Sequence, residues 1–124
     1  LNNFLMFNIR HFIKSFYFAL NGLAYVWKAE QSFRFQILIA AVVIFGGFFF
    51  KLSLMEFSLL TLLIVFVLAA EILNTVMEKL LDIAHPNWSP AVKTVKDISA
   101  AIVLVFSLGA LVVGILLFTP HIIQ

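Results

Sequence analysis

The sequence predicts an all-α integral membrane protein in which three transmembrane helices follow an N-terminal amphipathic helix. Hydrophobic residues make up 64% of the chain and charged residues 11%, whereas soluble domains average about 45 to 50% apolar and about 25% charged residues. The sequence also contains three long uncharged runs, separated by short segments that carry charges or prolines. We therefore expect one membrane domain over residues 1–124, because the chain is too short for an additional soluble domain.

A helix on the membrane surface is predicted over about residues 5–28. Apolar residues recur at helical spacing from Leu5 to Trp27, while the basic residues Arg10, Lys14 and Lys28 fall on another face. A helix divided in this way suits the headgroup layer of a bilayer. Packing of the apolar face against the rest of the bundle is the alternative, and the two are compatible.

Three spans are predicted, and they cover residues 30–52, 55–84 and 91–118. The first contains the uncharged run Phe35 to Phe50 and the second contains Phe57 to Ala70. With a turn added at their ends, such runs reach the roughly 30 Å of a hydrocarbon core. Pro86 and Pro90 separate the second span from the third, because proline disrupts the interior of a helix.

Lysine and arginine are unevenly distributed along the chain. Most of them precede the first span or flank the second loop, and Lys51 is alone in the first loop. The positive-inside rule therefore predicts a cytoplasmic N-terminus, a cytoplasmic second loop and an external C-terminus. No basic run or aromatic platform suggests nucleic acid as a partner, and the absence of cysteine excludes a thiolate metal site.

The second span ends in a stripe of acidic and amide side chains. At 100° per residue, one face carries Glu71, Asn74, Glu78 and Asp82. A bare carboxylate near the bilayer centre costs roughly 2.5 to 3.5 kcal/mol on insertion scales, so these groups need a partner charge, a metal ion or water. Further charged residues are expected at the same cytoplasmic end, namely Glu30, Lys96 and Asp97.

Three explanations of this cluster remain open. Structural ion pairs, such as Glu30 with Arg34 and Glu71 or Glu78 with Lys96, would stabilise an assembly subunit without activity. A proton or ion pathway would use the same carboxylates, but it requires acids at several depths and these lie at one end. A reaction at the membrane surface would use carboxylates as Mg²⁺ ligands and as a general base, with lysine to neutralise phosphate.

The residues of this cluster also resemble a known family. The motif Glu71-Ile-Leu-Asn74-Thr-Val-Met-Glu78 is followed by Asp82 and, after thirteen further residues, by Lys96-Asp97. This spacing resembles the signature of the prokaryotic diacylglycerol kinase family, which includes the Gram-positive-type undecaprenol kinases. The segments 19–23 and 29–34 resemble the family's surface helix and the entry to its first span.

The resemblance implies a lipid kinase of the bacterial cytoplasmic (inner) membrane, with three spans per chain and a homotrimeric assembly. Such an enzyme transfers the γ-phosphoryl group of MgATP to the hydroxyl of a membrane lipid, here diacylglycerol or undecaprenol. Mg²⁺ is the implied cofactor, ATP and the lipid are the implied partners, and the reaction takes place at the cytoplasmic surface.

The resemblance also implies a role for each matching residue. Glu71 would be the general base with Asn74 beside it, and Glu30 and Glu78 would bind Mg²⁺. The nucleotide site would comprise Glu30, Glu78, Lys96, Asp97, Trp88 and His11. The lipid would contact Glu71, Trp27, Arg34 and Ala100. His85 and His121 are expected to be ordinary surface residues.

Overall fold

The computed structural model describes residues 6–123, which form four helices and no strand. The helices are α1 (Ile9–Ala29), α2 (Gln31–Phe49), α3 (Leu54–Ala84) and α4 (Pro90–Ile122). The last three are long and apolar enough to cross a membrane. The predicted fold class, an all-α protein with three candidate spans after an N-terminal helix, is confirmed.

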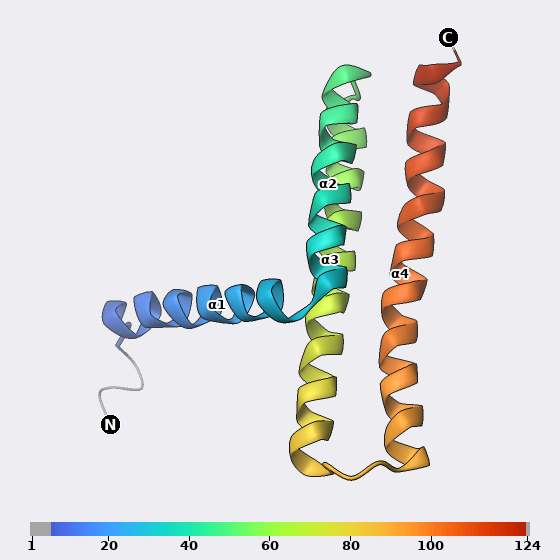
Figure 1. The fold of residues 1–124 in the computed structure, drawn as a ribbon. Coiled ribbons are helices and arrows are strands. Elements are labelled where there is room, and N and C mark those ends of the chain that lie inside the picture. The colour runs from blue at the N-terminus through green and yellow to red at the C-terminus, as the bar shows by residue number, and fades with distance from the viewer. Residues whose placement is uncertain (1–5, 124) are drawn as a thin grey trace.

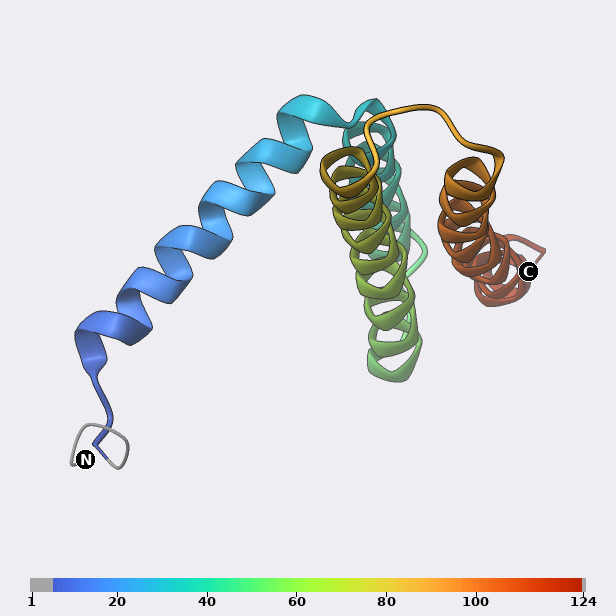
Figure 2. The same cartoon turned by 90° about the horizontal axis from the view of Figure 1, so that it is seen from below.

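α1 leaves the bundle sideways and meets it at one end of α2, as Figures 1 and 2 both show. The expected start at Leu5 lies outside the described residues. Within them the helix begins at Ile9, because the Asn8 side chain accepts hydrogen bonds from the backbone N–H of Arg10 at 3.1 Å and of His11 at 3.3 Å. At the other end, extended Glu30 (φ −114°, ψ 108°) separates α1 from α2 and makes the corner between them.

α2 has 19 residues, and at 1.5 Å per residue it measures about 28 Å, close to the roughly 30 Å of a hydrocarbon core. It ends in a Schellman motif. The N–H of Leu52 donates to the carbonyl of Gly47 at 3.0 Å, and the N–H of Lys51 donates to that of Phe48 at 3.3 Å. Lys51 has a φ of 56°, the left-handed conformation that this motif requires and that glycine usually supplies.

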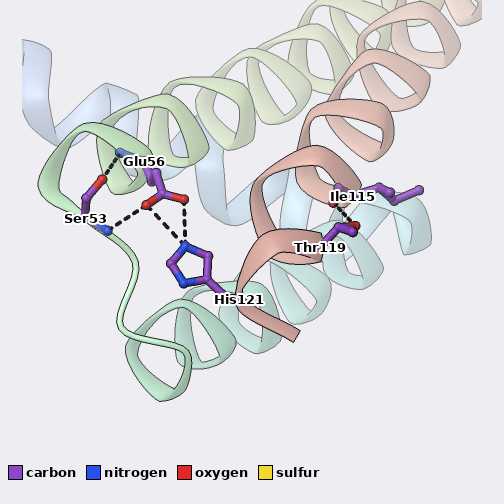
Figure 3. A network of polar contacts seen from close by, with 5 residues as sticks. All are labelled: Ser53, Glu56, Ile115, Thr119 and His121. Carbon is purple, nitrogen blue, oxygen red and sulfur yellow. Dashed lines mark hydrogen bonds and ion pairs between the residues drawn. The ribbon is translucent and has the colours of Figure 1, made fainter. Parts of the chain in front are cut away.

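α3 begins with a capping box, which fixes its first turn. The Ser53 hydroxyl accepts from the N–H of Glu56 at 3.2 Å, and the Glu56 carboxylate accepts from the N–H of Ser53 at 3.1 Å. The same carboxylate contacts His121 Nε2 of α4, at 3.0 Å and 3.3 Å from its two oxygens (Figure 3). His121 is therefore not the ordinary surface residue that the sequence suggested, because it joins the end of α4 to the start of α3.

α4 is longer than the sequence predicted, since it continues past Phe118 to Ile122 with Pro120 in its last turn. Proline lacks the N–H that would pair one turn back, but its fixed φ is compatible with a helix. The N–H of Ile123 still donates to the carbonyl of Thr119 at 3.1 Å, so the helix closes normally after the proline. The extra turn carries His121 to its contact with Glu56.

α3 and α4 are longer than a single crossing of the membrane requires. Their 31 and 33 residues correspond to about 46 and 50 Å, and both continue beyond the level at which α1 joins α2 (Figure 1). They run antiparallel, and the rings of Phe66 and Phe106 stack between them at 5.5 Å. The helices bury few apolar side chains, so most of the large hydrophobic residues are exposed on the outside of the chain.

Replacing Lys51 by glycine should stabilise the α2–α3 turn. A left-handed conformation costs a residue with a Cβ atom about 1 kcal/mol or more, and glycine avoids that cost. Thermal unfolding in detergent should therefore show a higher melting temperature for Lys51→Gly than for Lys51→Ala. Lys51→Ala is the matched control because it removes the same charge without relieving the backbone. Equal melting temperatures would contradict the assigned conformation.

Candidate functional site

Three of the four buried polar residues of the described chain lie within about one turn of α3. Glu71 is 5% exposed, Asn74 8% and Thr75 3%. The Thr75 hydroxyl donates to the carbonyl of Glu71 at 3.1 Å, so it is satisfied within its own helix. Glu71 and Asn74 carry side chains that must find partners elsewhere, and the stripe predicted from the sequence is therefore buried at its inner end.

The Glu71 carboxylate has one hydrogen-bond partner among residues 6–123, the side chain of Gln36 on α2. The Gln36 amide nitrogen lies 3.4 Å from Glu71 Oε2, which is a long hydrogen bond. No basic side chain of the described residues pairs with this carboxylate. The negative charges of Glu30 and Glu78 are close enough to repel the Glu71 carboxylate. Glu71 therefore needs a cation or a proton that this set of residues does not supply.

Asn74 contacts the next acid along α3, Glu78. Its amide nitrogen donates to Glu78 Oε1 at 3.2 Å, one turn further along the helix. Its own carbonyl oxygen is buried and accepts no hydrogen bond within the described part of the chain. An orphaned buried acceptor is uncommon in native proteins, and one at a site often reports a missing ligand or water. Asn74 thus orients Glu78 and still offers an acceptor.

Glu30 occupies the corner between α1 and α2. It is the N-cap residue of α2, yet its side chain makes no capping hydrogen bond. The corner is held instead by Arg34, whose Nη1 donates to the carbonyl of Trp27 at 2.6 Å and to that of Lys28 at 3.1 Å. The Glu30 carboxylate consequently remains available to a ligand. The ion pair of Glu30 with Arg34, considered from the sequence, is not formed.

The basic residues at the start of α4 have other partners than those considered from the sequence. Lys96 pairs with Asp82 of α3 at 2.7 Å, and Lys93 pairs with Asp97 at 2.7 Å one turn along α4. Neither lysine neutralises Glu71 or Glu78. Structural pairing with Lys96 therefore does not explain why the buried carboxylates are present. Both pairs are substantially exposed, so either can exchange its partner for a ligand at little cost.

The donor set fits Mg²⁺ only in part within one chain. Among residues 6–123 no group of three or more acidic or histidine side chains lies close enough to hold a metal ion. However, Mg²⁺ commonly takes one or two carboxylates and completes its shell with phosphate oxygens and water. Glu30 and Glu78, which have no basic partner in the described residues, are suitable as such a pair.

Several of the predicted site residues lie away from this cluster. His11 is near the free end of α1, about 28 Å from Glu30 along the helix, and Trp88 is exposed in the loop between α3 and α4. Ala100 is exposed on α4, and Trp27 is half exposed on α1. Within a single chain Glu71, Asn74 and Glu78 share one stretch of α3, and Glu30 is close enough to Glu71 for the two charges to repel. The remaining assignments stay predictions.

Two contacts at the site were not predicted from the sequence. Gln36 was counted as part of an uncharged run, although it is the one polar side chain between Arg34 and Lys51. That isolation was the signal that could have identified it. Lys79 lies 5.3 Å from the centre of the Tyr25 ring, a cation–π contact that ties α3 to α1. No local pattern marks this second pair.

Comparison with known proteins adds evidence to this geometry. A model of the family described as prokaryotic diacylglycerol kinase matches residues 17–118. An undecaprenol kinase of Bacillus subtilis (strain 168) is 33% identical over 112 residues, which cover 90% of this chain and 91% of that protein.

Diacylglycerol kinases are also similar, at lower identity. One from Synechocystis sp. is 27% identical over 89% of this chain and 63% of its own length. One from Helicobacter pylori (strain ATCC 700392 / 26695) is 25% identical over 77% of this chain and 75% of its own length.

Proposed function

Because this chain belongs to the prokaryotic diacylglycerol kinase family and is therefore an ATP-dependent lipid kinase, we propose that it phosphorylates its lipid at the buried stripe of α3. The γ-phosphoryl group of MgATP would pass to the lipid hydroxyl. The observation that carries this placement is Glu71, a buried carboxylate with no basic partner among the described residues and with one long amide contact.

Glu71 is the general base of the proposed reaction. It lies on α3 about 26 Å from the start of that helix at Leu54, close to the depth at which a bilayer-length segment ends. A lipid hydroxyl is held at that depth by its own headgroup region. The carboxylate accepts the hydroxyl proton as the lipid oxygen attacks the γ-phosphorus, and adenosine diphosphate leaves.

Glu30 and Glu78 are the proposed Mg²⁺ ligands. Mg²⁺ held by these two carboxylates would reduce the negative charge that Glu71 and the nucleotide bring together. Asn74 orients Glu78 through its amide, which supports this assignment. Lys96 and Asp97 belong to the nucleotide site in this proposal, and each would exchange its present ion pair for contacts to the nucleotide.

A homotrimer is proposed as the working assembly. The extensive apolar surface of the single chain supports it, because surface of this kind can be covered by lipid or by further copies. Assembly would also give His11 and Trp88 a route to a nucleotide bound on a neighbouring chain. We place the N-terminus and the α3–α4 loop in the cytoplasm and the C-terminus outside, from the distribution of lysine and arginine.

The lipid is diacylglycerol or undecaprenol, and undecaprenol is the one we propose. The similarity to the Bacillus undecaprenol kinase extends over nearly all of both chains, and its identity of 33% exceeds the 27% to the Synechocystis diacylglycerol kinase.

A proton or ion pathway receives less support. It would require polar side chains along the whole span, but the buried polar residues of the described chain are Glu71, Asn74, Thr75 and Ser99. The Glu56–His121 pair lies near the opposite end, with an apolar stretch of α3 between.

Glu71→Gln should reduce lipid phosphorylation by about 10² to 10⁴-fold, the range that general base catalysis contributes. The assay follows transfer of labelled phosphate from ATP to lipid in mixed micelles. Glu56→Gln is the matched control, because it makes the same change at the other end of α3 and glutamine also serves in a capping box. It should keep near-normal turnover. Equal activity of the two variants would remove Glu71 from the base position.

Glu30→Gln and Glu78→Gln should raise the Mg²⁺ concentration needed for half-maximal activity, by about ten- to a hundredfold, because an amide oxygen is a weaker ligand than a carboxylate. Titration of Mg²⁺ at fixed ATP measures this shift. An unchanged Mg²⁺ dependence in both variants would exclude these two residues as ligands.

Diacylglycerol and undecaprenol assayed in parallel should identify the substrate. We expect kcat/KM to be at least tenfold higher for undecaprenol. A preference for diacylglycerol of the same size would reverse the assignment of the lipid without affecting that of the base.

A further inference from the structure

Gln36 is an unusual residue in its setting. Every other side chain of the run from Phe35 to Phe50 is apolar or glycine. Its side chain also lines an otherwise mostly apolar cavity of about 620 Å³ between α2, α3 and α4, where it is one of the few polar groups. An amide in such surroundings is unfavourable unless its donors and acceptor are used. The contact that it makes should therefore identify its role.

That contact is to Glu71. The amide nitrogen of Gln36 donates to Glu71 Oε2 at 3.4 Å, and it is the only side-chain hydrogen bond between α2 and α3 in the described part of the chain. The carbonyl oxygen of the same amide is sealed from solvent and accepts no hydrogen bond. With the amide turned round, this oxygen would face a carboxylate and repel it. The side chain thus leaves its own acceptor unsatisfied while its donor is directed at Glu71.

The two oxygens of Glu71 are consequently not equivalent. Oε2 is held by Gln36, whereas Oε1 accepts no hydrogen bond from the described residues and is not among the atoms sealed from solvent. A lysine or arginine at position 36 would neutralise the carboxylate, and an apolar residue would leave its rotamer unfixed. A neutral amide holds one oxygen and keeps the charge available for proton transfer.

We propose that Gln36 is a positioning residue for this kinase, because its amide holds Glu71 Oε2 and so directs Oε1 to the hydroxyl of the lipid. The inference rests on the proposed role of Glu71 as the base. Gln36 acts through Glu71 and has no part in binding the nucleotide. Its removal should therefore lower kcat and leave the KM for MgATP unchanged, since a misplaced base slows the chemical step.

The test replaces Gln36 with methionine, which has a similar length and no hydrogen-bond donor. Gln36→Met should lower kcat by about tenfold and change the KM for MgATP by less than twofold. Gln31→Met is the matched control, because Gln31 is on the same helix but exposed. It should leave kcat unchanged. Wild-type kcat in Gln36→Met would overturn the proposal.

A double variant separates positioning from a purely structural role. In Glu71→Asp the carboxylate is one methylene shorter, which withdraws it from Gln36 but leaves a base in place. Gln36→Met added to Glu71→Asp should lower kcat by less than twofold, because the contact is already lost. A tenfold loss in both backgrounds would mean that Gln36 acts independently of Glu71, and this would also overturn the proposal.

The outcomes for the two proposals are distinguishable. Full activity of Glu71→Gln would refute the proposed base, and with it the role of Gln36. An inactive Glu71→Gln together with a fully active Gln36→Met would refute the role of Gln36 alone. A lowered melting temperature of Gln36→Met, with kcat per folded enzyme unchanged, would make Gln36 a packing residue and likewise refute its positioning role.

Discussion

The burial of the Glu71 carboxylate is the constraint that the rest of the structure accommodates. Removing a charge from water is costly unless a partner compensates it, and breaking such compensation destabilises a fold strongly. Here the compensation within the described residues is one amide from α2, while Glu30 and Glu78 add repulsion. An arrangement with so little internal compensation is typical of a functional site, where a bound cation or a transferred proton completes the electrostatics.

The unequal lengths of the helices determine where this carboxylate lies. α2, with 19 residues, matches the thickness of a hydrocarbon core, whereas α3 and α4, with 31 and 33 residues, are longer than such a core and continue past the level of α1 (Figure 1). The excess length is on the side that carries the acidic stripe. In the proposed reaction a lipid confined to the bilayer and a nucleotide confined to water can therefore meet along one helix, with the proposed base Glu71 nearer the bilayer and the proposed metal ligand Glu78 further out.

The opposite end of the bundle has a structural role. The capping box of Ser53 and Glu56 fixes the start of α3, and His121 joins it to the last turn of α4 (Figure 3). The rings of Phe48 and Phe57 pack at 4.8 Å beside the same turn. The polar groups of Ser53, Glu56 and His121 thus find hydrogen-bond partners within the chain, in contrast to those around Glu71. The two ends of α3 thus differ in the way their acidic residues are compensated, and among residues 6–123 the buried polar atoms without a partner belong to Gln36 and Asn74, beside the acidic stripe.

Sequence reasoning alone predicted the helical class, the three candidate spans and the single stripe of Glu71, Asn74 and Glu78 on α3, because hydropathy and helical periodicity are local properties of the chain. The motif spacing also identified the family. Which side chains meet became clear only from the folded chain: Gln36 contacts Glu71, Lys96 pairs with Asp82 rather than with the buried acids, and His121 contacts Glu56. These pairs join different helices, and the rotation of one helix against another is fixed by packing over their whole length. No local pattern encodes that rotation.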